Sequence, residues 1–210
     1  MWHTLTLIFP YVIAYTIPLL LASLGGLYSE RSGVVNLGLE GLMLVGCFAA
    51  ALVIHLLQDK LPLNLLIPIG LLAAVAAGIL CSLLHAFASI TLKADQIISG
   101  TAINMLAAAL TVYTARAILG SGNVRVNSII RKDIPGLANI PVLGPLFFSQ
   151  SYWSTWLVLA ILVFSWFLLY KTSFGLRLRA CGEHPSAVAS AGVNVHKMRY
   201  SIFHHIDNIL

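Results

Sequence analysis

Hydrophobic residues follow one another along this chain in long stretches, which are separated by short charged islands. The five longest uncharged stretches are Met1–Ser29, Gly41–Gln58, Leu61–Leu92, Gln96–Ala115 and Ile134–Tyr170. About 20 apolar residues in a helix cross a hydrocarbon layer roughly 30 Å thick. The pattern therefore predicts an all-α, polytopic transmembrane helical bundle. Its five spans are expected at about residues 5–27, 36–57, 65–90, 96–118 and 152–170.

The composition leaves no room for a sizeable soluble domain, so residues 1–210 are expected to form one transmembrane domain. Charged residues make up 9% of the chain, against about 25% in soluble domains. The net charge of +5 is explained by Lys and Arg kept near the cytoplasmic lipid surface, so no nucleic-acid partner is expected. Cys47, Cys81 and Cys181 form no CxxC pair, which argues against a disulfide framework or a zinc site.

Basic residues after the fifth span set the orientation. They are Lys171, Arg177, Arg179, Lys197 and Arg199. The positive-inside rule makes the tail, residues 172–200, cytoplasmic. Counting back, the turns at Glu30–Arg31 and Lys93–Asp95 are cytoplasmic, whereas Asp59–Lys60 and the N-terminus lie outside. The loop 119–151 is then extracytoplasmic, and its apolar content predicts an ordered cap on the outer face.

Two polar residues open the second predicted span. Asn36 and Glu40 are four residues apart, so in a helix both would point to the same side. A charge at bilayer depth costs about 2.5–3.5 kcal/mol even on a lenient scale. We therefore expect Glu40 to face protein or water and not lipid.

The fourth predicted span carries a small, polar stripe. Its members, spaced 4-4-3-4, are Gln96, Gly100, Asn104, Ala107 and Thr111. Two interpretations stay open for such a stripe. It forms part of a substrate pathway with Asn36, Glu40, Gln96, Asn104 and Thr111, or it holds the helices together by interhelical hydrogen bonds.

Catalytic and metal-binding patterns are missing from the sequence. It contains no GxSxG, HExxH or Walker A motif. His204, His205 and Asp207 carry metal-ligand side chains, but such residues in a terminal tail are usually solvated. His55 and His85 have no evident partners for an intramembrane enzyme. No catalytic residue, metal or cofactor is therefore predicted.

The tail contains one short segment with clear helix boundaries. Pro185 suits the first helical position, Glu183 suits the positive end of a helix, and Gly192 suits a left-handed C-cap. A helix of about two turns is marginal in water and needs a surface to pack against.

The expected surface of this helix is small and alanine-rich. Ala187, Val188 and Ala191 share one side. A strong lipid-binding helix has a larger apolar face. The segment is therefore predicted to dock into a protein groove, with the lipid surface as the alternative.

Three segments, taken together, resemble a known family. They are RLRACGEHPSAVASAGVNV at residues 177–195, SERSGVVNLGLEGLMLVG at 29–46 and ADQIISGTAIN at 94–104. They are similar to bacterial ATP-binding-cassette importer permeases for branched-chain amino acids, simple sugars and nucleosides, especially the nucleoside and simple-sugar branch. The resemblance implies that residues 182–192 dock into a cytoplasmic ATPase. The coupling residues would be Gly182, Glu183, Pro185, Ala187, Ala191 and Gly192.

This resemblance implies a permease subunit that translocates a nucleoside or simple sugar across the bacterial cytoplasmic membrane. Its implied partners are an ATPase chain, which hydrolyses the ATP, a second permease subunit, an extracytoplasmic solute-binding protein and membrane lipid. Permeases of the family continue beyond the coupling segment, so we expect this chain to be short at its C-terminus. The alternative is a secondary transporter driven by an ion gradient. Such transporters often contain inverted repeats, and none is evident here. A single embedded carboxylate, Glu40, is weak support for this alternative.

Overall fold

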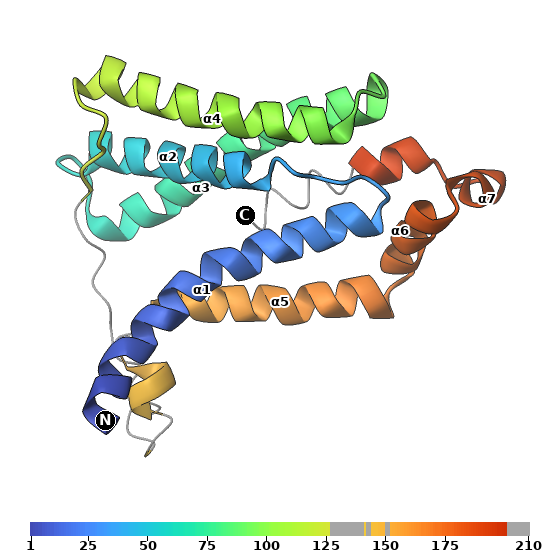
Figure 1. Cartoon of the computed structure of the whole chain (residues 1–210). Coiled ribbons are helices and arrows are strands. Elements are labelled where there is room, and N and C mark those ends of the chain that lie inside the picture. Colours follow the sequence, from blue (N-terminus) through green and yellow to red (C-terminus); the bar gives the residue numbers. More distant parts are fainter. Residues whose placement is uncertain (127–140, 142–143, 150–151, 201–210) are drawn as a thin grey trace.

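The structure is a computed structural model that describes residues 1–126, 141, 144–149 and 152–200. Its helices are α1 (Trp2–Arg31), α2 (Leu39–Leu57), α3 (Leu63–Ala86), α4 (Gln96–Leu119), α5 (Trp153–Lys171), α6 (Ser173–Glu183) and α7 (Pro185–Ser190), with π-helical turns η1 (Phe87–Thr91) and η2 (Gly144–Phe148) (Figure 1). Residues 195–200 are also helical. The described part of the chain contains no strand, which confirms the all-α prediction.

Five helices are long and apolar enough to span a membrane, as the hydrophobic pattern predicts. The second begins at Leu39 and not at residue 36. The cause is local, because the Asn36 side chain accepts a hydrogen bond from the Gly38 amide at 2.9 Å and closes a turn. Asn side chains often replace helical hydrogen bonds in this way. The premise that Asn36 and Glu40 share one helical face is therefore wrong.

The long helices form two groups that are visible in Figure 1. Helix α2 packs against α3 and α4, whereas α1 packs against α5. Close approach within the first group uses glycine: a Cβ atom placed on Gly46 would touch Ala74, and one on Gly70 would collide with Ile54. Small residues let spanning helices associate where lipid is as apolar as their side chains. Among the described elements, α5 makes no comparable contact with α2, α3 or α4.

The chain alternates between two ends of the bundle. The end of α1, the start of α2, the turn before α4 and helices α6 and α7 lie together at one end (Figure 1). The N-terminus of α1 and η2 lie at the opposite end. This agrees with the alternation expected from the charged islands, and the assignment of one end to the cytoplasm stays a prediction.

Part of the predicted outer loop packs against the bundle. The ring centroids of Phe147 and Phe9 are 5.0 Å apart in an edge-to-face arrangement. Phe148 stacks on Trp156 with centroids 4.9 Å apart. These contacts hold η2 against α1 and α5, whereas most of the remaining loop lies outside the described residues. An ordered cap over the whole loop stays a prediction.

Candidate functional site

Helix α6 fixes the tail to the ends of α1 and α5. Thr172 begins the helix, because its hydroxyl accepts a hydrogen bond from the Gly175 amide at 3.2 Å. Leu178 is fully buried and packs with Tyr28 and Leu169 in one apolar cluster. The Tyr28 hydroxyl donates to the Ser165 carbonyl at 3.1 Å, which ties α1 to α5 beneath this cluster.

The end of α6 meets the turn after α1 through two glycines. Gly33 has φ +79°, a left-handed conformation that glycine adopts without steric cost. A Cβ atom on Gly33 would lie 3.1 Å from the Cα atom of Gly182. One on Gly182 would lie 2.5 Å from the Arg31 carbonyl oxygen. Two of the three segments that carry the family resemblance therefore touch through their backbones.

Helix α7 has the boundaries that the sequence predicts. Pro185 is at its first turn, and Gly192 beyond its end has φ +82°. The break between α6 and α7 falls at His184, so Glu183 is the last residue of α6. No residue of α7 is buried, and Ala187 and Ala191 are both exposed. The helix thus presents a small, open surface, and its docking to another protein stays a prediction.

Two amide side chains of α4 hold the segment that leads into α2. Gln96 accepts a hydrogen bond from the Val35 amide at 2.8 Å. Asn104 donates to the Leu37 carbonyl at 2.9 Å and accepts from the Gly41 amide at 2.7 Å. Both functional groups of the Asn104 side chain are therefore used in fixing the start of α2 on α4.

Gly100 and Asn104 of the predicted α4 stripe contact the start of α2. Gly100, Ala107 and Thr111 are buried. A Cβ atom on Gly100 would lie 2.9 Å from the Gly38 amide nitrogen, so the two backbones are in close contact. This geometry favours the interpretation in which the stripe holds helices together. A contribution of Asn104 and Thr111 to a substrate pathway stays a prediction.

Asn36 and Glu40 have different surroundings. Asn36 is buried, with 5% of its surface exposed, and its Nδ2 atom has no hydrogen-bond partner among the described residues. Glu40 is exposed in the first turn of α2. A carboxylate there interacts favourably with the unpaired amides of the helix start. The two residues do not form one polar surface in this structure, and their pathway role is untested.

His55 and His85, which the sequence gives no evident enzymatic partners, both make hydrogen bonds in the structure. His85 is fully buried, with its Nδ1 atom 3.0 Å from the Ser99 hydroxyl and its Nε2 atom 3.4 Å from the Ser89 hydroxyl. The Nδ1 atom of His55 contacts the Arg125 carbonyl. Ser99 is 14 residues from His85, and the turn through η1 brings them together. The sequence shows no periodic signal for such a pairing.

The helical segment 195–200 completes the contacts at this end of the bundle. Arg199 donates from Nε to the Ser32 carbonyl at 3.2 Å. The hydroxyls of Tyr200 and Thr91 are hydrogen-bonded, so the segment also reaches η1. Burial raises the pKa of the Cys181 thiol, and the positive charge of Arg199 lowers it by a smaller amount.

Among the described residues, no group of three or more His, Cys, Asp or Glu side chains is placed so that it could hold a metal ion. His204, His205 and Asp207 lie outside the described residues.

Residues 8–205 match the family described as the permease component of branched-chain amino acid transport systems. The chain belongs to this family. Its match covers all three segments that meet at the α6–α7 end. With five apolar helices, this member of the permease family is a multi-pass membrane protein.

Several named permeases are similar to the chain. It is 48% identical to the guanosine ABC transporter permease NupQ of Bacillus subtilis, over 93% of this chain and 62% of that protein. It is 38% identical to the nucleoside ABC transporter permease NupC of Lactococcus lactis, over 95% of this chain and 63% of that protein. A putative glucose ABC transporter permease of Haloferax volcanii, TsgC13, is 36% identical to the chain, over 87% of this chain and 53% of that protein.

The chain thus spans less than two thirds of the length of these relatives. No solved structure matches it.

Proposed function

We propose that this protein is a membrane-spanning subunit of an ATP-binding-cassette importer that moves a nucleoside or a simple sugar into a bacterial cell. The observation that carries the proposal is its similarity, over more than nine tenths of its length, to permeases named for guanosine and nucleosides. The putative glucose ABC transporter permease TsgC13 supports simple sugars as the second solute class. The bacterial cytoplasmic membrane is the corresponding location.

The ATPase partner would bind the surface of α7. Its exposed Ala187 and Ala191 suit a groove in another protein, because small side chains permit close approach. The rigid contact between Gly33 and Gly182 would carry a displacement of α7 to the turn between α1 and α2. Closure of the ATPase would thereby change the position of α2, which holds α3 and α4.

Two further partners follow from the same mechanism. A second permease subunit would complete the pathway, because α5 makes no contact with α2, α3 or α4 and the described helices form two separate groups. An extracytoplasmic solute-binding protein would deliver the solute at the η2 end. In the assembled importer, binding energy shifts the population between two arrangements of the helices.

Co-purification tests the docking of the ATPase. Ala187→Arg together with Ala191→Arg places two long, charged side chains on α7 and its C-cap, and we expect the ATPase to be lost from the purified complex. Asn123→Arg adds one charge at an exposed site at the opposite end of the bundle and is the matched control. Retention of the ATPase by the double variant would show that α7 is not the coupling element.

Uptake measurements test the solute and the energy source. Cells that produce the complete transporter are expected to accumulate radiolabelled guanosine or another nucleoside in an ATP-dependent manner, with glucose as the competing candidate. Accumulation that persists without ATP and collapses with the proton gradient would support a secondary transporter and contradict the proposal.

A further inference from the structure

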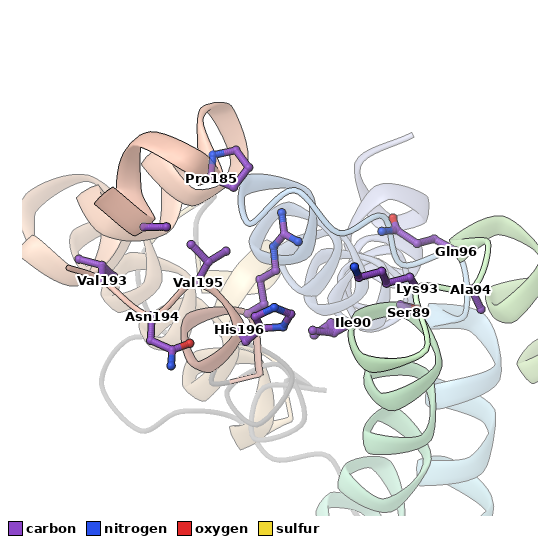
Figure 2. A pocket seen from close by; sticks show the side chains of 12 residues that line it. Ser89, Ile90, Lys93, Ala94, Gln96, Pro185, Val193, Asn194, Val195 and His196 are labelled. Atoms are coloured by element: carbon purple, nitrogen blue, oxygen red, sulfur yellow. The ribbon is translucent and has the colours of Figure 1, made fainter. Parts of the chain in front are cut away.

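A cavity of about 630 Å³ lies beside α7, between two parts of the chain that are far apart in sequence (Figure 2). One wall comes from η1 and the turn before α4, and the other comes from α7 and residues 193–199. In Figure 2, Lys93 and Gln96 project from one wall and face Val195 and His196 on the other. The volume is within the range of about 300–1,000 Å³ that is typical of small-molecule sites.

Basic side chains from both walls line this cavity. Lys93 comes from the turn before α4, whereas His196 and Arg199 come from the tail. The lining contains no Asp or Glu. Arg199 uses Nε on the Ser32 carbonyl, which leaves its two terminal nitrogens without a partner among the described residues. Cations from Arg and Lys form short, strong hydrogen bonds with phosphate oxygens.

The wall that contains Lys93 has an unusual backbone. Lys93 has φ +51° and is the one described residue other than glycine with positive φ. It lies two residues after the π-helical turn η1, which contributes Ser89 and Ile90 to the cavity. Backbone outliers and π-helical turns cluster at functional sites, where the surrounding structure maintains them. Here they direct a lysine toward a cavity that already contains an arginine.

Apolar side chains cover the rest of the lining. Ile90 lies on one wall, and Val193 and Val195 lie on the other. A free phosphate ion would fill a small fraction of the volume and leave these side chains uncovered. A molecule with a ring system and a phosphate group would contact both the apolar and the basic parts.

We propose that this cavity binds a phosphorylated nucleoside or sugar on the ATPase side of the membrane, with Lys93, His196 and Arg199 holding the phosphate. The proposal rests on the proposed function, because an imported nucleoside or sugar becomes such a compound after one phosphoryl transfer in the cell. A ligand bound in this cavity would contact both the tail and the turn before α4, and would hold the two together. Since α7 would need to move during transport, the bound product holds the transporter still and slows further import.

The binding test uses the full chain in nanodiscs of phosphatidylcholine, with calorimetric titration of GMP, guanosine and inorganic phosphate. We expect GMP to bind at least about tenfold more tightly than guanosine, because one charge-assisted phosphate contact is worth more than about 1.4 kcal/mol. Lys93→Asn should weaken GMP binding at least about fivefold. Asn tolerates positive φ, so this variant keeps the fold. Lys197→Asn removes a charge from the same face but not from this cavity, and should change affinity less than about twofold.

Equal affinities for GMP and guanosine, or GMP binding that is insensitive to Lys93→Asn, would overturn the proposal. A second set of nanodiscs contains phosphatidylglycerol. If this lipid stabilises the chain through Lys93 and GMP does not compete with it, the phosphate belongs to a lipid headgroup, and the metabolite assignment is wrong. If Lys93→Asn affects ATPase association alone, the cavity receives an acidic side chain of the ATPase, and the proposal is again wrong.

The regulatory step is tested in the assembled importer. GMP added on the ATPase side should lower the rate of nucleoside uptake, and Lys93→Asn should restore it. The titration needs neither transport nor ATPase. A chain that binds GMP but imports nothing therefore contradicts only the proposed function, and a working importer that ignores GMP contradicts only this inference.

Discussion

Gly33 and Gly182 lie against each other with no side chain between them, although 149 positions separate them in the sequence (182 − 33). The first follows α1 in a left-handed turn, and the second is near the end of α6. Backbone-to-backbone contact of this kind cannot be adjusted by a change of rotamer. The position of the tail is therefore fixed directly by the position of the turn between α1 and α2.

Gly182→Ala is expected to destabilise the protein. The new Cβ atom would lie 2.5 Å from the Arg31 carbonyl oxygen, and relief of that clash requires α6 to move away from α1. Overpacking of this kind costs about 1–3 kcal/mol. The melting temperature of the detergent-purified protein, followed by size-exclusion chromatography after heating, measures the loss.

Gly122→Ala is the control for this substitution. Its Cβ atom would have ordinary contacts, since the nearest atom is 3.6 Å away, and its φ is not positive. We expect a melting temperature close to that of the unchanged protein. Equal melting temperatures for Gly182→Ala and Gly122→Ala would mean that the glycine contact does not hold α6 in place.

Asn104→Ala should loosen the start of α2. The buried Gly41 amide would lose its acceptor, and an unpaired buried amide costs about 1–3 kcal/mol. Thr101→Ala is the control, because its hydroxyl is exposed and bonds only to carbonyls of its own helix. If Asn104→Ala preserves the melting temperature but abolishes uptake, Asn104 serves the substrate pathway and not the contact between helices.

The stability of the protein should depend on pH through Cys181. Burial raises the pKa of this thiol above its ordinary value of 9.0, so the neutral form is favoured in the folded protein. This contribution is fully present below pH 9.0 and is lost as pH rises through the pKa of the folded state. The variant Cys181→Ser lacks this pH-dependent contribution to stability.

Thermal unfolding of the two proteins from neutral pH upward tests this dependence. The stability difference in favour of the cysteine should shrink at alkaline pH. A stability difference between the two proteins that stays constant above pH 9.0 would contradict the prediction.

Accessibility of single cysteines should establish the orientation. Lys60 follows α2, Lys197 follows α7, and both are exposed. The end of α2 and helix α7 lie at opposite ends of the bundle (Figure 1), so Lys60→Cys and Lys197→Cys report on the two sides. A membrane-impermeant maleimide is expected to label Lys60→Cys in intact cells, and Lys197→Cys only after permeabilisation. The unchanged protein reports background from Cys47 and Cys81. Labelling in the reverse order would place the tail outside the cell and contradict the charge-based orientation.

The spans are predictable from the sequence because each is a long apolar stretch bounded by charge. That property is local, and it located all five helices to within a few residues. The predicted start of α2 at residue 36 is wrong because Asn36 forms a turn with Gly38, and apolar content does not distinguish a turn of this kind from a helix.

The contacts at the α6–α7 end were less predictable. The ends of α7 follow from Pro185 and Gly192, whose backbone preferences are strong. The pairing of Gly33 with Gly182 and of His85 with Ser99 depends on how separate helices pack. No spacing rule within a single helix contains that information. The cavity beside Lys93 cannot be predicted from the sequence for the same reason, because separate segments line it.

The amide nitrogen of Asn36 is buried without an acceptor among the described residues. An unmade hydrogen bond of this kind disfavours the present arrangement by about 1–3 kcal/mol. A difference of a few kcal/mol is what separates the major and minor conformers of proteins that switch between states. A shift of the turn before α2 that brought a carbonyl group to this nitrogen would recover that free energy, so such a movement would cost less here than in a protein whose buried amide is already paired.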